Sequence, residues 1–449
     1  MPLTHPVPEA LDETAAPEGE SLMDQGPFPD VLPPDERTFF RGRLLHKLRT
    51  FIAENGSLAT MFCVVFVNLV GFGIVVPLLP FFAQSLSAAP FRTTQVWMVT
   101  CMFSAYSLGQ FFAEPYCGRL SDRIGRKPIL IATTLLSTLF YVALAVTQNI
   151  WLAIALRFMS GLSSGSLSTI QAYVADVSRP EQRATRLGVI GAGFSLGFVI
   201  GPFIGGSLTN VHAGPRGFEL PLFIAAGMSA LASIGVMLFI RESRQRQPTQ
   251  DQPNLFETAR EGLKSPVITR ALLSMLCYMI AFAGLESIFG MWAKRLYNWG
   301  PAQIGGIFLF IGAAVALAQM VLMRPLVRRY GEYRVLAGGL FLFGLSFVLQ
   351  CLNGQAVMIV PIVMLGALGQ AVIFSSICAI ISMATPGDRQ GAMLGVNMST
   401  GAIARIVGPI VAGFAFSAFG PNAPLWTGAA MTIPAGLLAL QVGRYRKSA

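Results

Sequence analysis

Twelve apolar stretches, each about 20 residues long, recur along this 449-residue chain and constrain its fold more than any other feature. A helix of that length crosses the roughly 30 Å hydrocarbon core of a bilayer. Only 12% of the residues are charged, against roughly 25% in average soluble proteins. Because lipid-exposed backbone must satisfy its own hydrogen bonds, the sequence predicts an all-α polytopic membrane protein. The expected spans are residues 58–84, 95–117, 128–147, 151–175, 187–210, 219–240, 270–292, 301–323, 335–352, 356–382, 391–418 and 423–442.

The net charge of +10 follows the predicted connections between spans. If the N-terminus is cytoplasmic, the inner connections hold 26 of the 32 lysines and arginines. The outer connections hold only Arg92, Arg216, Lys294 and Arg295. This asymmetry obeys the positive-inside rule and predicts that both termini lie in the cytoplasm. Topology therefore explains the basic charge, and no nucleic-acid partner is predicted.

Polar segments divide the chain into five parts. In residues 1–57, the first 36 hold nine acids and eight prolines but no lysine or arginine, a composition typical of a disordered tail and not of a secretory signal. Residues 37–57 favour a basic flank, with a short amphipathic helix on the inner leaflet as the alternative. Residues 241–269 are expected to form a cytoplasmic loop between two six-helix bundles, 58–240 and 270–442, and residues 443–449 a cytoplasmic tail.

The six cysteines and three histidines show no pattern typical of cross-linking or metal binding. The cysteines all fall in predicted spans without paired spacing, and the histidines are scattered. The sequence predicts neither a disulfide framework nor a metal site. No cluster of nucleophile, base and acid emerges either, so an enzyme and a bound cofactor are not predicted.

The two halves of the chain resemble each other. Gly125 matches Gly331, and Arg183 matches Arg389, at an offset of 206. At an offset of 207, the matches are Gly188 with Gly395, Gly201 with Gly408, Pro202 with Pro409 and Gly206 with Gly413. Matches in this order indicate a duplication, although chance is the alternative in a chain with 46 glycines.

Two motifs stand out from the apolar background. The first is GRLSDRIGRKP at 118–128, where Gly118 and Gly125 permit a tight turn and Asp122 is a lone carboxylate among cations. The second lies in the fifth span, where small residues four apart admit a neighbouring backbone and a proline lets the helix bend. Its residues are Gly188, Gly197, Gly201, Pro202, Gly205 and Gly206.

On these motifs the chain resembles the major facilitator superfamily, and most of all the twelve-span drug:proton antiporters that include the tetracycline exporters. The resemblance covers residues 58–442. It implies two pseudo-symmetric six-helix bundles that handle a substrate between them near the midplane. It also identifies the glycine string of the fifth span as the family's antiporter motif, whereas ordinary helix packing would explain the spacing alone.

The resemblance implies that the hairpin is a gate loop, formed by Gly118, Asp122, Arg123, Gly125, Arg126 and Lys127. The family's aspartate, here Asp122, interacts with the N-terminal end of the eleventh span, where the helix dipole favours negative charge. The second arginine, here Arg126, pairs with an acid that ends the fourth span, here Asp176. The equivalent loop of the second half has reversed charges, with Arg328 in the register of Asp122.

Four charged residues fall inside predicted spans: Glu114, Arg157, Glu286 and Arg405. Each costs at least a few kcal/mol unless paired or hydrated, so each is a candidate functional residue. Glu286 and Arg405 lie at similar heights and could form an ion pair, which would be either permanent or released when Glu286 takes up a proton.

Arg157 resembles the family's conserved arginine, which is implicated in proton transfer. The alternative is a structural partner for backbone carbonyls or for Glu114. Glu114 lies only about 6 Å above the gate loop, which favours a brace for the gate over a proton site.

The first span departs from the tetracycline exporters, because Asn68 stands where they carry an aspartate. Asparagine offers hydrogen bonds without titrating, so Asn68 is assigned a substrate contact. Aromatic candidates for the cavity are Phe72, Phe282, Phe289 and Phe374, although packing and lipid-facing positions are the commoner use of such residues. Two intramembrane arginines favour neutral, zwitterionic or anionic amphipathic substrates over permanent cations.

Taken together, the sequence predicts a monomeric exporter of the bacterial inner membrane that exchanges protons for a small organic molecule. The proton gradient would be its energy source. An uptake symporter or a uniporter on the same fold is the alternative, and a non-transporting sensor or scaffold is a third.

The reversed charges of the two hairpins predict an asymmetry in transport. We expect Asp122→Asn to slow transport more than Arg328→Gln, because only the first hairpin carries an acid able to latch the outward-facing state. Initial transport rates in vesicles, normalised to the amount of protein in the membrane, measure this. Equal rates in the two variants would remove the asymmetry.

Overall fold

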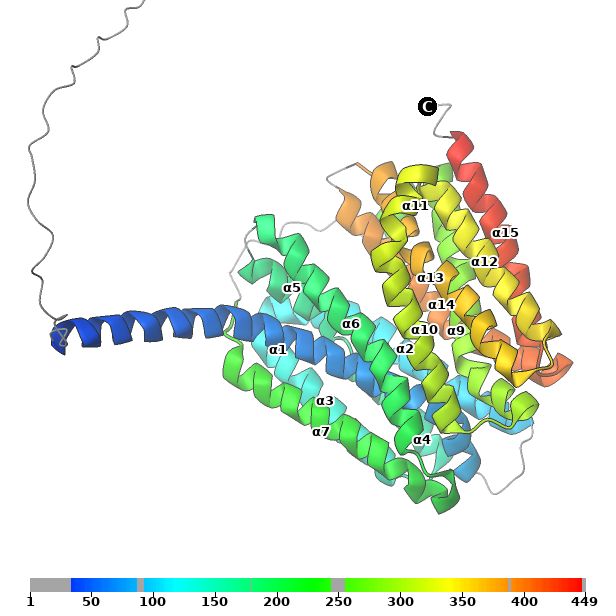
Figure 1. The fold of residues 1–449 in the computed structure, drawn as a ribbon, viewed down its shortest axis with the longest axis horizontal. Coiled ribbons are helices and arrows are strands. Elements are labelled where there is room, and N and C mark those ends of the chain that lie inside the picture. Colours follow the sequence, from blue (N-terminus) through cyan, green and yellow to red (C-terminus); the bar gives the residue numbers. More distant parts are fainter. Residues whose placement is uncertain (1–33, 87–92, 179, 244–254, 387–388, 446–449) are drawn as a thin grey trace, which may run out of the picture. The chain divides into compact units, whose positions relative to one another are not determined.

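A computed structural model describes residues 34–86, 93–178, 180–243, 255–386 and 389–445 (Figure 1). Within these ranges the structure is helical and contains no strands. The chain forms two compact units, Met1–Ile52 and Ala53–Ala449. Of the first unit only residues 34–52 are described, and they are helical.

The helices fall into two sets joined by a connection that contains α8 (Leu255–Gly262). The first bundle contains the part of α1 (Pro34–Leu86) from Ala53 onward. Its other helices are α2 (Thr93–Ile124), α3 (Arg126–Val146), α4 (Ile150–Ser163), α5 (Ser166–Val177), α6 (Pro180–Leu208), the 3-10 helix η1 (Val211–Phe218) and α7 (Glu219–Phe239). The second bundle consists of α9 (Pro266–Tyr297), α10 (Pro301–Val321), α11 (Met323–Tyr330), α12 (Glu332–Leu352), α13 (Ala356–Ala384), α14 (Gln390–Phe419) and α15 (Ala423–Tyr445).

Twelve helical segments are long and apolar enough to cross a membrane, which confirms the expected number and order of spans. The first, Gly56–Leu86, was expected at 58–84, and the last, Ala423–Gln441, at 423–442. Residues 37–57, for which the sequence favoured a basic flank, belong to the long helix α1. The expected disordered stretch 1–33, residues 244–254 of the central loop and residues 446–449 of the tail lie outside the described residues.

The gate loop is tighter than the sequence suggested. We expected the second span to end at residue 117 and both glycines to turn the chain, but α2 continues to Ile124. Gly118 is therefore helical, and Gly125 alone separates α2 from α3, with φ +110. Such a φ suits glycine and strains other residues. Gly331, with φ +77, makes the equivalent single-residue break between α11 and α12.

The fourth span is interrupted, which the sequence did not predict. It consists of α4 and α5, separated by a turn at Ser164 and Gly165. A side chain at Gly165 would meet Ala113 of α2, with its Cβ 2.8 Å from the Ala113 Cβ. The break therefore lies where the fourth span packs against α2.

The antiporter motif packs α6 against α1 at backbone distance. A Cβ at Gly197 would lie 2.6 Å from the Phe66 carbonyl oxygen, and one at Gly201 would lie 2.7 Å from that of Val70. At Gly205 a Cβ would overlap the carbonyl oxygen of Ile74. Gly188 has open space instead, so the motif is a packing groove only from Gly197 onward.

The second bundle repeats this packing with fewer glycines. A Cβ at Gly408 in α14 would lie 2.7 Å from the Ile280 carbonyl oxygen in α9, the same distance as at Gly201 in the first bundle. Ala404 and Ala412 occupy the positions that correspond to Gly197 and Gly205. The two bundles therefore share one helix-packing scheme, as a duplication implies.

The bundles meet at the helix ends opposite the gate loop. A Cβ at Gly206, next to the motif's last groove glycine, would overlap the carbonyl oxygen of Pro301 at the start of α10, and α6 and α10 lie side by side (Figure 1). Lys294 Nζ in the last turn of α9 donates to Gln84 Oε1 in the last turn of α1 at 2.6 Å. A Cβ at Gly413 would lie 2.8 Å from Thr100 Oγ1 near the start of α2.

This packing predicts that Gly205→Ala is destabilising while Gly191→Ala in the same helix is not. The methyl group at position 205 would overlap the backbone of α1, and forced overpacking costs about 1–3 kcal/mol. Gly191 has nothing within 4 Å of its Cβ position, so it is a matched control. Thermal unfolding of the purified variants in detergent measures the difference. A similar loss in both variants would contradict the assignment, because helix propensity alone makes Gly→Ala stabilising and only close approach distinguishes position 205 from position 191.

Candidate functional site

Arg126 is the centre of a charge network at the gate loop. Its Nη1 lies 2.5 Å from Asp122 Oδ1, and its Nε lies 3.2 Å from Asp176 Oδ2 at the end of α5. Nη1 also donates to Ser121 Oγ at 2.6 Å. The structure thus contains the Arg126–Asp176 pair that the resemblance implied. The expected contact of Asp122 with the start of α14 is not among the hydrogen bonds and ion pairs of the described residues.

A second carboxylate reaches the gate loop from the end of the first bundle. Glu242, just beyond α7, accepts hydrogen bonds from the backbone N–H groups of Arg126 at 2.8 Å and Lys127 at 3.0 Å. These two N–H groups begin α3 and have no acceptor within the helix, and the helix dipole favours a negative charge there. The carboxylate occupies the space that a Cβ at Gly125 would need. Lys127 Nζ donates to Met237 O at 2.8 Å.

Arg157 is fully buried in α4, and none of its three guanidinium nitrogens has a hydrogen-bond partner among the described residues. Its Cζ lies 4.4 Å from the centroid of the Tyr106 ring and 6.0 Å from that of Phe72. Cation–π attraction of this kind offsets part of the cost of burying the charge. Glu114, one expected partner, instead accepts a hydrogen bond from Gln110 Nε2 at 3.0 Å.

Glu286 in α9 is also buried, and its Oε1 has no hydrogen-bond partner. Its charge interacts most strongly with that of Arg405 in α14 and next with that of Arg157 in the first bundle. Arg405 is half-buried and also interacts with Glu114. Among the described residues no ion pair joins Glu286 to either arginine, so the expected Glu286–Arg405 relation is electrostatic without direct contact.

A chain of aromatic rings crosses from the first bundle to the second. Ring centroids are 5.0 Å apart for Tyr106 and Phe72, and 6.5 Å apart for Phe72 and Phe198. Phe198 in α6 then lies 6.4 Å from Phe282 in α9, which lies 6.1 Å from Tyr278. Two of the aromatic residues expected to line a cavity, Phe72 and Phe282, are therefore connected through Phe198.

Three other residues expected at the cavity lie outside this chain of rings. Phe289 is buried within the second bundle, with its ring centroid 5.8 Å from that of Trp292. Phe374 is exposed on α13. Asn68 Nδ2 donates to Ser166 Oγ at 2.8 Å, which ties α1 to the first turn of α5.

The Major Facilitator Superfamily family model matches this chain in two overlapping segments, residues 61–324 and 272–448. The chain belongs to the Major Facilitator Superfamily. Over 402 residues it is 27% identical to the class C tetracycline resistance protein of Escherichia coli. The alignment covers 88% of this chain and 98% of that protein. Over 367 residues it is 27% identical to multidrug resistance protein 1 of Bacillus subtilis (strain 168), covering 81% of this chain and 90% of the relative.

Solved transporters of low sequence identity share the fold of this superfamily member. The human organic anion transporter MFSD10 aligns with a TM-score of 0.64 and 23% identity, over 86% of this chain and 99% of that chain. A bacterial homologue of the human lysosomal transporter Spinster aligns with a TM-score of 0.70 and 12% identity, over 88% and 97% of the two chains. The twelve-helix architecture is therefore that of the superfamily.

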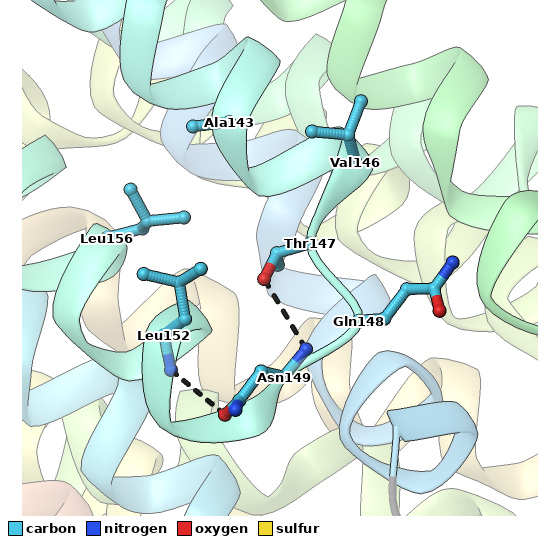
Figure 2. A pocket seen from close by; sticks show the side chains of 7 residues that line it. All are labelled: Ala143, Val146, Thr147, Gln148, Asn149, Leu152 and Leu156. Carbon is cyan, nitrogen blue, oxygen red and sulfur yellow. Dashed lines mark hydrogen bonds between the residues drawn. The ribbon is translucent and has the colours of Figure 1, made fainter.

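An open, mostly apolar pocket of about 600 Å³ lies where α3 turns into α4 (Figure 2). Its lining consists of Ala143, Val146, Thr147, Gln148, Asn149, Leu152 and Leu156. Asn149 Oδ1 accepts hydrogen bonds from the backbone N–H groups of Trp151 at 2.9 Å and Leu152 at 3.3 Å, which caps α4. None of the four intramembrane charges lines this pocket, so we place the candidate site at the charges and the ring chain.

Sequence reasoning missed Glu242, Phe198 and Tyr106. The sequence did contain a signal for Glu242, because this acid stands among cations at the end of the sixth span. A flank that only orients the span in the membrane requires cations and no acid. Phe198 directly follows the motif residue Gly197, but nothing in a single sequence shows which bundle its ring contacts. Tyr106 acquires its role only from the position of Arg157 in a neighbouring helix.

We expect Glu242→Gln to destabilise the protein by about 1 kcal/mol, because a neutral amide is a weaker partner for a helix N-terminus than a carboxylate. Glu332→Gln is the matched control, since it removes a charge from the start of α12, where Glu332 has no hydrogen bond to backbone N–H groups among the described residues. Thermal unfolding in detergent should show a lower midpoint only for Glu242→Gln. Equal shifts would mean that the two backbone hydrogen bonds contribute nothing specific.

Proposed function

We propose that this chain is a proton-coupled antiporter that exports a small amphipathic organic molecule by alternating access. Its superfamily carries out secondary transport, and the relatives described above are tetracycline and multidrug resistance proteins. The fifth span carries the complete glycine and proline pattern of antiporters, and those glycines pack α6 on α1. These observations support export by exchange over the other modes of transport.

One observation carries the proposal: two opposite charges, Arg157 and Glu286, are buried in different bundles without hydrogen-bond partners. Burying an unpaired charge in a membrane protein costs at least a few kcal/mol. Because such a charge destabilises the fold, a functional role explains it better than a structural one. When Glu286 is ionised, it and Arg157 would attract each other across the two bodies that must move during alternating access. A proton on Glu286 would abolish that attraction.

The proton would act as follows. Ionised Glu286 attracts Arg157 across the bundles and Arg405 within its own bundle. Protonation removes the negative charge, which weakens both attractions and lets the bundles separate at this height. Deprotonation restores them. A proton taken up and released at one residue therefore changes the relative stability of two arrangements, which is what coupling requires.

The gate loop would control the opposite half of the cycle. The inter-bundle contacts described above lie at the helix ends away from this loop, which supports a state closed there and open at the gate loop. In the alternative state, Asp122 of the loop would face the start of α14, as the resemblance implies. Arg126 and Glu242 hold the loop in shape for that contact.

The substrate site would lie along the ring chain. Phe72, Phe198 and Phe282 offer apolar ring surface from both bundles, and Arg157 and Arg405 offer positive charge nearby. This combination favours neutral, zwitterionic or anionic amphipathic molecules. The transporter MFSD10, which shares the fold, is named for organic anions, in line with that preference.

We place the protein in the bacterial inner membrane as a monomer, with both termini in the cytoplasm. The twelve apolar helices and the bacterial relatives support the membrane assignment, and the concentration of 26 of the 32 basic residues on one side of the spans supports the orientation of the termini. The proton gradient is the proposed energy source. No cofactor enters this mechanism.

An uptake symporter or a uniporter on the same fold is the second candidate, and Asn68 favours the uniporter. Asn68 replaces the aspartate of the tetracycline exporters and uses its amide to hold Ser166, so the first span offers no titrating group at this position. If neither Glu286 nor Glu114 carried the proton, no acid within the spans would be left for proton coupling.

Proteoliposomes with an imposed pH gradient and tetracycline as probe test the proposal. The wild type should accumulate the probe only when the gradient is present. Glu286→Gln should lower gradient-driven accumulation by about tenfold or more, because its side chain cannot exchange a proton, while exchange of labelled for unlabelled probe continues. Glu257→Gln, at an exposed glutamate of α8, is the control and should behave like the wild type.

The other outcomes contradict specific parts of the proposal. Probe flux that ignores the gradient in the wild type would favour the uniporter. Full gradient-driven accumulation in Glu286→Gln would exclude Glu286 as the proton carrier. Failure of both coupled accumulation and exchange in the wild type, repeated with a panel of amphipathic anions, would favour a non-transporting role.

A further inference from the structure

A small surface pocket lies on α2 beside the gate loop. It has a volume of about 190 Å³ and is lined by Tyr116, Arg119, Leu120 and Arg123. The proposed transport cycle uses Asp122 and Arg126 of this segment but leaves Tyr116 and Arg119 without a role. The pocket combines two cations with aromatic and aliphatic surface.

The pocket belongs to a face of α2 that no neighbouring helix covers. Toward the second bundle α2 presents Ser104, whose Oγ donates to Ile406 O at 2.9 Å. Toward α4 it presents Gly109, against the backbone of Phe158. Between these faces, Phe112 is 54% exposed and Tyr116 is 60% exposed. In a helix that crosses a membrane, such apolar exposure faces lipid.

The two arginines of the pocket have no acidic partner in the part of the chain that the structure describes. Arg119 Nε donates to the carbonyl oxygen of Pro115 at 3.3 Å, and Arg123 makes no hydrogen bond or ion pair with the described residues. Arg126, which follows the break at Gly125 and begins α3, is by contrast paired with both Asp122 and Asp176. The charge of Arg119 and Arg123 is therefore available to a ligand.

The spacing of these residues fits a phospholipid. Residues 108, 112, 116, 119 and 123 recur every three or four positions and so lie along one face of the helix. The apolar part, Leu108 to Tyr116, is about 12 Å long, which lies within one leaflet of roughly 15 Å. The arginines follow it at the end near the gate loop, where the headgroup phosphate of that leaflet would lie.

The charge of the pocket selects among headgroups. Arginine binds phosphate through several N–H groups at once, and two arginines one turn apart present them to the same anion. No carboxylate lines the pocket, so it offers nothing to the ammonium group of a zwitterionic headgroup. We infer that Tyr116, Arg119, Leu120 and Arg123 form a binding site for an anionic phospholipid, with its phosphate on the two arginines and an acyl chain along Phe112.

Such a site acts on the gate loop through the last turn of α2. Arg123 directly follows Asp122 in α2, and Arg119 lies one turn before Arg123 in the same helix. A lipid phosphate held by both arginines fixes this turn at the membrane surface. Anionic lipid would thereby limit how far Asp122 can move toward or away from α14.

Native mass spectrometry of the purified protein, after exchange into phosphatidylglycerol or into phosphatidylcholine with the same acyl chains, tests the site. We expect the wild type to retain phosphatidylglycerol in preference to phosphatidylcholine. The double variant Arg119→Gln/Arg123→Gln should retain at least about tenfold less phosphatidylglycerol, because each lost cation removes a contact to the phosphate. Arg328→Gln/Arg329→Gln in the equivalent hairpin is the matched control, since it removes the same charge from exposed arginines outside the pocket.

A second variant separates loss of charge from loss of stability, and a soluble probe separates lipid binding from binding of a free anion. Arg119→Lys/Arg123→Lys keeps the charge and should retain more phosphatidylglycerol than the glutamine variant, even if both lower the thermal stability. Equal retention of the two lipids by the wild type, or an equal loss in the control pair, would overturn the site. If millimolar inorganic phosphate displaces phosphatidylglycerol completely, the pocket recognises the anion alone, and the proposed acyl-chain contact along Phe112 is wrong.

Discussion

The close approach of α6 to its two neighbours is the contact on which this architecture depends. The backbone of α1 occupies the position that a Cβ at Gly205 would need, and the backbone of α10 occupies the position that a Cβ at the next residue, Gly206, would need. One helix of the first bundle is thus packed at backbone distance on a partner in each bundle. Side chains at these positions would force the helices apart, so the twelve spans could not form the same contact between bundles.

The two hairpins show how one backbone design carries different electrostatics. Each consists of a single glycine with positive φ between two helices, Gly125 in the first bundle and Gly331 in the second. The first is held by Asp122, Asp176 and Glu242, whereas the second has Arg328 in the register of Asp122. Duplication preserved the turn, which glycine alone fixes, and left the surrounding charges free to diverge.

Much of this structure could be predicted from the sequence, because its strongest signals are local. The twelve spans follow from hydrophobic length, and the pairing of Arg126 with Asp176 follows from a family motif. What could not be predicted depends on how distant helices meet. The break at Gly165 lies against Ala113, Glu242 reaches α3 from beyond α7, and Phe198 meets Phe282 across the bundles. The expected ion pair between Glu286 and Arg405 is not formed among the described residues, because two residues at similar heights along neighbouring helices need not point toward each other.

The anchoring of Glu242 sets a limit on rigid-body motion. Because this carboxylate is bound to the start of α3, the covalent link between the bundles begins at residue 242, and α8, which packs against α14, begins at Leu255. About 13 residues of fully extended chain reach at most about 45 Å. The linker is therefore a tether of fixed maximum length, and the angle through which the two halves can rock has a ceiling that lengthening or shortening this segment would reset.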